Sequence, residues 1–171
     1  MKKVLITGSK GFIGKNLKLY LSQYKEIEII CFDKNDDEEL LPEILKKVDI
    51  IFHLAGVNRS TNDHDFKRVN TDFTKKLCEY IKYINRKISI VYTSSIQAEN
   101  NNSYGISKKK AEEILVNLKN EHDVNIHIFR LPNVFGKWSK PNYNSVIATF
   151  CYNISREIPI RIDDKNKILE L

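Results

Sequence analysis

The fold is decided by the stretch Thr7-Gly8-Ser9-Lys10-Gly11-Phe12-Ile13-Gly14, which follows the apolar run Val4-Leu5-Ile6 and precedes apolar residues at helical spacing. This order predicts a strand, a glycine-rich turn and a helix. Glycines three residues apart permit a tight turn and let a phosphate approach the backbone, while the helix start offers free N–H donors. We therefore predict that a dinucleotide phosphate binds this turn, at Gly8, Lys10, Gly11, Phe12, Ile13 and Gly14.

Strand and helix patterns alternate along the rest of the chain. We expect further strands at 27–32, 50–54, 88–93 and 124–129, and further helices at 38–48, 69–84, 103–121 and 145–155. This alternation predicts an α/β fold with a doubly wound parallel sheet, the NAD(P)-binding Rossmann fold. Ligands bind such sheets at the carboxyl ends of the strands, where the polar motifs of this chain fall.

Composition narrows the class of protein. The chain has 171 residues, a formal charge of +6 and 42% hydrophobic residues, which predicts one folded domain with a preference for polyanionic ligands.

No apolar run approaches the 18 or so residues of a membrane span, and the N-terminus is unlike a secretory signal, so we expect a cytoplasmic location. The cysteines and histidines lack ligand spacing, so no metal is expected.

The end of the second strand bears on the choice of cofactor. Asp33 lies 19 positions after Gly14, where a carboxylate can accept hydrogen bonds from the adenosine ribose. A carboxylate there would repel the additional phosphate of NADP(H), but the neighbouring Lys34 could offset that repulsion. The sequence therefore predicts NAD or NADP, with Asp33 and Lys34 as cofactor contacts.

A candidate catalytic group follows the fourth expected strand. Tyr104 lies nine positions after Ser95. Tyr104 and Lys108 are four residues apart, which places them on one face of a helix. At roughly 5 Å the lysine would lower the pKa of the phenol by about two units. Tyr104 could then act as an acid or base while Ser95 hydrogen-bonds the reacting oxygen.

These motifs together with His53-Leu54-Ala55-Gly56 resemble the extended short-chain dehydrogenase/reductase family, whose members act on sugar nucleotides. The resemblance implies Ser95, Tyr104 and Lys108 as the catalytic triad, with Ser94 the less favoured serine. It implies that Asp49 lies near the adenine. It also implies cofactor contacts from Leu54, Ala55, Gly56, Tyr104, Lys108, Pro132 and Asn133.

A closer resemblance, carried by residues 54–59, 94–98 and 135–151, is to reductases of capsular-polysaccharide precursor synthesis. It implies NAD(P)H-dependent reduction of a UDP-linked 4-keto-6-deoxy-2-acetamido sugar. Substrate contacts would come from Arg59, Ser95 and Asn144, although Asn144 could equally cap the helix that follows it. Residues 131–171 would begin a substrate-binding lobe, to be followed by a further C-terminal domain.

Two other functions stay open. Ile96 and Gln97 stand where dehydratases of the family carry an acidic pair, which disfavours dehydration and leaves reduction or epimerisation. A sugar-nucleotide epimerase is one alternative, and a non-catalytic dinucleotide-binding module is the other. We expect a UDP-sugar as substrate and a homodimer as the assembly, with neither nucleic acid nor a membrane as partner.

Overall fold

The computed structural model describes residues 1–143, 145–162, 164–166 and 168. The chain divides into two compact units, residues 1–130 and 131–171, and each is described by itself. That the second unit begins a substrate-binding lobe stays a prediction.

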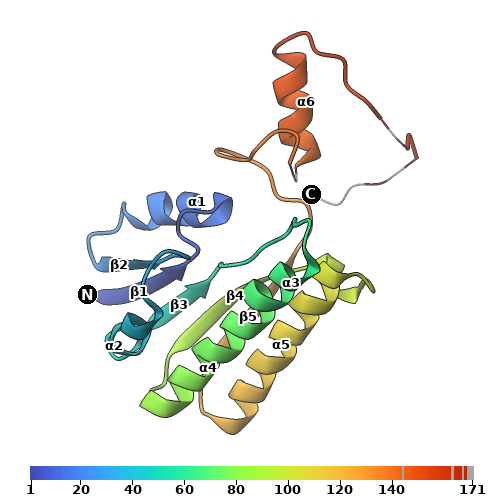
Figure 1. The fold of residues 1–171 in the computed structure, drawn as a ribbon. Helices are drawn as coiled ribbons and strands as arrows, with labels where there is room; N and C mark the ends of the chain where they lie inside the picture. The colour runs from blue at the N-terminus through green and yellow to red at the C-terminus, as the bar shows by residue number, and fades with distance from the viewer. Residues whose placement is uncertain (144, 163, 167, 169–171) are drawn as a thin grey trace. The chain divides into compact units, whose positions relative to one another are not determined.

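The first unit is built on a five-stranded sheet with the order β2-β1-β3-β4-β5 (Figure 1). Pairing is parallel between β1 and β2, β1 and β3, and β3 and β4. The predicted doubly wound parallel sheet is therefore confirmed. The strands are β1 (Lys2–Thr7), β2 (Ile27–Phe32), β3 (Ile50–His53), β4 (Ser89–Ser95) and β5 (Ile126–Leu131).

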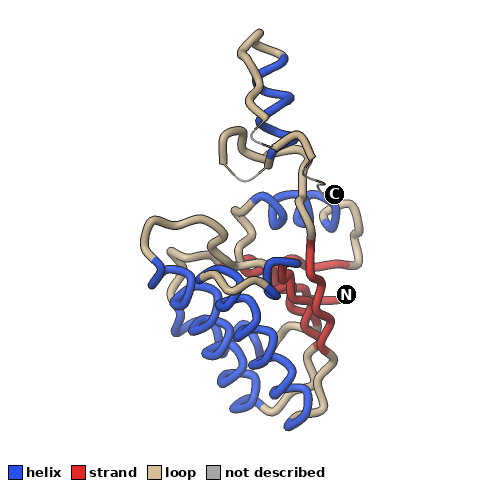
Figure 2. The backbone as a smooth tube through the Cα atoms, turned by 90° about the vertical axis from the view of Figure 1, so that its right-hand side faces the viewer, coloured by secondary structure: helices blue, strands red, loops and turns tan. Residues whose placement is uncertain are grey.

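Helices cover both faces of this sheet (Figures 1 and 2). One face carries α1 (Phe12–Leu21), and the other carries α2 (Leu41–Leu45), α4 (Phe73–Ile84) and α5 (Ser103–Glu121). The short 3-10 helices η1 (Glu38–Leu40) and η3 (Ile96–Glu99) precede α2 and α5. The bounds of β2 and α5 agree with the prediction, whereas the helix expected at 38–48 is shorter.

One helical stretch differs from a regular α-helix. The chain is helical from α3 (Asp63–Phe66) through a π-helical segment, η2 (Lys67–Asp72), into α4. The sequence predicted this helix only from residue 69. The side chain of Asn62 caps its start by accepting a hydrogen bond from the His64 backbone, so His64 lies at a polar helix start.

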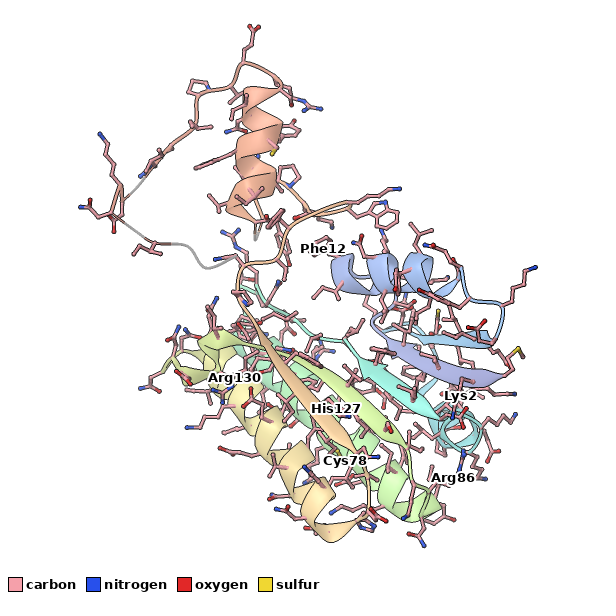
Figure 3. All side chains as sticks on the ribbon, turned by 180° about the vertical axis from the view of Figure 1, so that it is seen from behind. Lys2, Phe12, Cys78, Arg86, His127 and Arg130 are labelled. Carbon is pink, nitrogen blue, oxygen red and sulfur yellow. The ribbon has the colours of Figure 1, made fainter. Side chains whose placement is uncertain are left out.

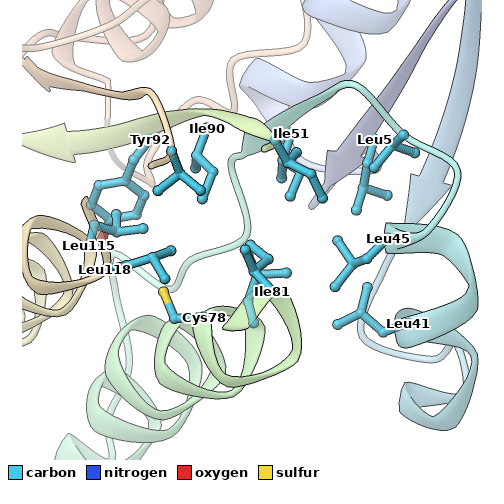
Figure 4. Close-up of a cluster of buried hydrophobic side chains, with 14 of the residues drawn as sticks. Leu5, Leu41, Leu45, Ile51, Cys78, Ile81, Ile90, Tyr92, Leu115 and Leu118 are labelled. Carbon is cyan, nitrogen blue, oxygen red and sulfur yellow. The ribbon is translucent and has the colours of Figure 1, made fainter. Parts of the chain in front are cut away.

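The side chains of β1 alternate between two cores, as a pleated strand requires. Leu5 points to the larger core, and Val4 and Ile6 point to the smaller core under α1. Figure 4 shows the larger core, in which side chains of the sheet meet those of α2, α4 and α5. Its largest fully buried members are Tyr92, Leu5, Leu41, Leu45, Ile51, Leu77, Ile81, Ile88, Ile90, Leu115 and Leu118.

The strand order creates a topological switch point beside β1. Because β1 lies between β2 and β3, the chain turns to opposite sides after β1 and after β2, and such a switch point is where Rossmann-type sheets bind ligands. Figure 3 shows Phe12 and Arg130 at the carboxyl-terminal edge of the strands and Lys2 at the opposite edge. The candidate site is built at the former edge.

The second unit contains α6 (Val146–Ile154). Ser145 caps this helix by accepting a hydrogen bond of 3.2 Å from the Ala148 backbone. Asn144, for which a cap or a substrate contact was predicted, lies outside the described residues. Among the described residues, no helix has the length and apolar character needed to cross a membrane.

Candidate active site

The glycine-rich turn is closely packed at two of its glycines. Gly8 has a φ of +73°, and a Cβ there would lie 2.7 Å from the Ala55 backbone nitrogen. A Cβ at Gly14 would lie 2.3 Å from the Gly8 carbonyl oxygen. The start of α1 can therefore sit against the turn only because these positions lack side chains. Gly11 precedes α1 in an extended conformation, and the first turn of α1 contains no acidic residue, so the arrangement suits a phosphate.

Asp33 closes the turn from the end of β2. Its carboxylate accepts hydrogen bonds from the Ser9 hydroxyl at 2.6 Å and from the Lys10 backbone at 3.0 Å. Asp33 is buried, whereas Lys10 and Lys34 are exposed beside it. The structure thus places the predicted residues of this part of the site together. It adds Ser9, whose role the sequence analysis did not foresee.

The segment after β3 lies against the same turn. The Ala55 backbone donates a hydrogen bond of 3.3 Å to the Thr7 hydroxyl, which also pairs with His53 Nδ1 at 2.8 Å. Nε2 of His53 pairs with the Thr74 hydroxyl at 2.8 Å. Burial, aided by the nearby charge of Lys108, lowers the pKa of His53 to about 3, so the ring is neutral. His53 therefore stabilises the turn through its two hydrogen bonds and does not act as an acid or base.

Asp49 is not near this edge of the sheet. It precedes β3, and its carboxylate accepts a hydrogen bond of 2.9 Å from the backbone of Lys3 at the amino-terminal end of β1. The implied position beside the adenine is therefore wrong, because the carboxyl ends of the strands form the opposite edge.

Ser95 and Tyr104 are brought together by a close contact between two helices. A Cβ at Gly105 would lie 2.2 Å from the Gln97 carbonyl oxygen, so α5 can begin against η3 only with glycine there. Ser95 ends β4, is buried, and accepts a hydrogen bond of 3.2 Å from the Gln97 backbone. Burial raises the pKa of Tyr104, and a hydrogen bond with Ser95 partly offsets that rise.

Lys108 lies one turn further along α5. Its ammonium donates a hydrogen bond of 2.8 Å to the Thr93 carbonyl and lies 4.7 Å from the centre of the Tyr92 ring. A Cβ at Gly56 would be 3.4 Å from this ammonium, so Lys108 faces the segment that follows β3. Burial lowers the pKa of Lys108 to about 8, although Glu112 acts in the opposite direction.

The predicted effect of Lys108 on Tyr104 is not found in this structure. Burial dominates the phenol and raises its pKa, and the Lys108 ammonium is engaged by the Thr93 carbonyl. The spacing of the two residues on a helix predicts only the effect of the ammonium charge, whereas burial also removes the phenolate from water and thereby raises the pKa of Tyr104. Tyr104 is therefore protonated near neutral pH, as a proton donor must be.

Asn70 is a buried polar residue that the sequence analysis missed. Its side chain accepts a hydrogen bond of 2.8 Å from the Val57 backbone, and it donates 2.9 Å bonds to the Val57 carbonyl and the Ser107 hydroxyl. Ser107 in turn donates to the Tyr104 carbonyl at 2.7 Å. Asn70 thus joins the segment after β3 to α5. Thr71 and Thr74 are buried beside it on the same helical stretch, so no local pattern in the sequence singled out Asn70.

Other predicted contacts come from the loop after β3 and from the second unit. Arg59 is exposed in the loop after β3, and Pro132 and Asn133 belong to the second unit. Their cofactor and substrate contacts, like that of Asn144, stay predictions. Within the described residues no group of three or more histidine, cysteine or acidic side chains could hold a metal ion.

The comparisons with known proteins agree with this geometry. A model of the NAD dependent epimerase/dehydratase family matches residues 4–167. A UDP-2-acetamido-2,6-beta-L-arabino-hexul-4-ose reductase of Pseudomonas aeruginosa is 50% identical over 99% of this chain and 45% of its own length. A UDP-glucose 4-epimerase of Vibrio cholerae is 27% identical over 93% of this chain and 58% of its own.

Solved structures give the same result. The crystal structure of the capsular polysaccharide assembling protein CapF from Staphylococcus aureus matches with a TM-score of 0.83 and 43% identity, over 97% of this chain and 45% of that one. The chain spans about half the length of the curated relatives it matches.

Proposed function

This chain belongs to the NAD-dependent epimerase/dehydratase family, and from that membership we propose that it carries the cofactor-binding half and the catalytic triad of a sugar-nucleotide reductase. The substrate would be a UDP-linked 4-keto-6-deoxy-2-acetamido sugar used for capsular or other surface polysaccharide. The 50% identity to a reductase of that substrate class supports this choice over an epimerase. The expected cytoplasmic location and homodimer stay predictions.

The observation that carries the proposal is the position of Lys108. Its ammonium lies on the same helix as Tyr104 and also faces the Gly56 backbone, so the catalytic helix and the cofactor-binding segment meet at one cation. The cradle formed by Gly8 and Gly14 and closed by Asp33 suits a dinucleotide. The positive charges of Lys10 and Lys34 beside Asp33 could bind the additional phosphate of NADPH, while the Asp33 carboxylate favours NADH.

The reaction can be assigned to the residues of this chain. A bound reduced nicotinamide would supply the hydride that forms the new C–H bond at C4 of the sugar. Ser95 would hydrogen-bond the ketone oxygen as negative charge develops on it. Tyr104 would transfer its phenolic proton to that oxygen, leaving a phenolate and the 4-hydroxy product. Lys108 would hold the cofactor ribose and stabilise the phenolate through its positive charge.

The test has a binding arm and a turnover arm. In the first, NADH and NADPH are titrated into the chain by fluorescence, and saturable binding is expected. In the second, loss of the reduced cofactor is followed with the UDP-4-keto sugar. Tyr104→Phe should abolish turnover and leave cofactor affinity within about twofold, because the ring is retained.

Each other function predicts a different result. An epimerase would interconvert UDP-sugars without net consumption of cofactor. A non-catalytic module would bind cofactor and show no turnover, even when the second half of a relative is supplied. Failure of a folded chain to bind either cofactor would contradict the proposal.

A further inference from the structure

An ion pair between the buried Glu112 and the exposed Arg130 lies next to the Ser95, Tyr104 and Lys108 cluster. The carboxylate of Glu112 is almost inaccessible to solvent and accepts a hydrogen bond from the Ser94 hydroxyl. Arg130 donates to the same carboxylate from Nε at 3.0 and 3.2 Å and from Nη2 at 2.7 Å. Nη1 of Arg130 donates to Glu99 at 2.7 Å. These groups form a fully paired network without a part in the proposed reaction.

The network joins the elements that carry the triad. Glu112 lies on α5, one turn beyond Lys108, while Ser94 is the neighbour of Ser95 on β4. Arg130 comes from β5, and its second partner, Glu99, comes from η3, against which α5 begins. A shift of α5 relative to β4 would therefore break charge-assisted hydrogen bonds, which are among the strongest in proteins.

The hydrogen bonds at the end of β4 distinguish the two serines. Because the Ser94 hydroxyl is bound to Glu112, the Ser95 hydroxyl is the one presented to Tyr104. The sequence motif contains both serines and gives no reason of this kind to choose between them.

The charge of Glu112 acts on Lys108 as well. The titratable groups that interact with the Lys108 ammonium are His53 on β3, Tyr92 on β4 and Glu112 on α5. Tyr104 lies one turn earlier on α5, and Arg130 reaches Glu112 from β5. Of these, His53 is neutral, and both phenols are protonated because burial raises their pKa. Burial opposes ionisation of Glu112 too, but hydrogen bonds from Arg130 and Ser94 keep its pKa below the usual range.

We propose that Glu112, held by Arg130, is a positioning residue for the triad: it fixes Ser94 away from the reacting atoms and supplies the negative charge that keeps the buried Lys108 ammonium protonated. This inference rests on the proposed function for its meaning, because Lys108 needs its charge to bind the ribose and stabilise the phenolate. Its physical content concerns the protonation of Lys108 and can be measured without any ligand.

The experiment is a pH titration of Lys108 by NMR in the full chain with ¹³C-labelled lysine, with Lys108→Met used to assign the signal. Glu112→Gln should lower the Lys108 midpoint by roughly one pH unit, because the carboxylate charge is removed and the Arg130 charge stays. Arg130→Met should raise the Lys108 midpoint, because it removes the positive charge that offsets the negative charge of Glu112. Glu99→Gln, whose side chain is 76% exposed, is the matched control and should leave the midpoint unchanged.

The opposite signs separate this role from a structural one. If both changes shifted the midpoint in the same direction, or neither shifted it, the inference would be wrong. Circular dichroism reports whether each variant folds, and either variant alone tests the sign of the effect. A wild-type chain that binds no cofactor would contradict the proposed function and leave this titration interpretable. If the wild-type chain binds cofactor and Glu112→Gln leaves the Lys108 midpoint unchanged, the inference is contradicted and the proposed function is not.

Discussion

The Ser9 hydroxyl donates a 2.6 Å hydrogen bond to the carboxylate of Asp33, and this bond ties the glycine-rich turn after β1 to the end of β2. The other carboxylate oxygen accepts from the Lys10 backbone at 3.0 Å. Asp33 thus holds the turn in shape in addition to any contact with a ribose. Each carboxylate oxygen can accept a second hydrogen bond, so the two roles are compatible.

The two roles can be separated by a pair of substitutions. Asp33→Ser should weaken NADH binding more than NADPH binding, shifting the affinity ratio by about tenfold, because the lost carboxylate is both a ribose acceptor and a repellent of the additional phosphate. Ser9→Ala removes only the turn contact and should weaken both cofactors equally. Fluorescence titrations measure the ratio, and an equal shift of the ratio in the two variants would show that the carboxylate acts through the turn alone.

The glycines of the turn should differ in their tolerance of a methyl group. Gly14→Ala would place a Cβ 2.3 Å from the Gly8 carbonyl oxygen and 2.7 Å from Ser9 Cα, both of them backbone atoms. We expect it to lower the free energy of unfolding by about 2 to 3 kcal/mol. Gly11→Ala meets the same oxygen at 3.1 Å and should cost under about 1 kcal/mol. Urea denaturation tests the order, and equal losses would contradict it.

Stability should fall as the pH falls below neutrality because of His53. Its pKa in the folded chain is about 3, against about 6.5 when unfolded, so protonation favours the unfolded state. The contribution is complete above pH 6.5 and is lost progressively between pH 6.5 and 3, by about 2 kcal/mol at pH 5. His53→Gln can keep the contacts to Thr7 and Thr74 without titrating. Its unfolding free energy should change less over pH 6.5 to 5, and a parallel loss in both proteins would rule His53 out as the cause.

Tyr92 offers a substitution that should stabilise the chain. Its hydroxyl is buried and has no hydrogen-bond partner among the described residues. Tyr92→Phe keeps the ring beneath Lys108 and removes the unpaired group, so the free energy of unfolding should rise by up to about 1 kcal/mol. Tyr92→Leu should lower it, since the cation–π contact is lost as well. A less stable Tyr92→Phe protein would indicate that the hydroxyl is hydrogen-bonded in solution.

Much of the fold could be predicted because its signals are local. The alternation of strand and helix patterns gave the parallel sheet, and the long helical run at 103–121 gave the bounds of α5. In the structure the Asn102 side chain caps the start of this helix. The spacing of Tyr104 and Lys108 predicted that they share one face of a helix, and the resemblance added Ser95. The structure joins Ser95 to Tyr104 and places Lys108 one turn further along α5, while their catalytic roles stay predictions.

What the sequence did not reveal depends on contacts between distant segments. Arg130 meets Glu112 and Asn70 meets Ser107 only after the sheet has formed, and nothing in the local pattern marks these partners. The pKa of Tyr104 was predicted in the wrong direction because burial is a property of the folded chain. Asp49 was misplaced by the resemblance, although the strand expected at 50–54 already puts this residue at the amino-terminal end of β3.

The π-helical segment Lys67–Asp72 constrains how this region can change in length. On one side of it Phe66 packs against the Tyr104 ring, with 5.9 Å between centroids, and on the other Thr74 pairs with His53. A π-helical turn holds about one more residue than an α-helical turn, so the six residues of the segment turn the chain about as far as five α-helical residues would. A one-residue deletion that converted the segment to regular α-helix would therefore keep both anchors near their partners. Loss of one residue should be tolerated better within Lys67–Asp72 than within α4, where it would turn the buried Leu77 and Ile81 away from the core.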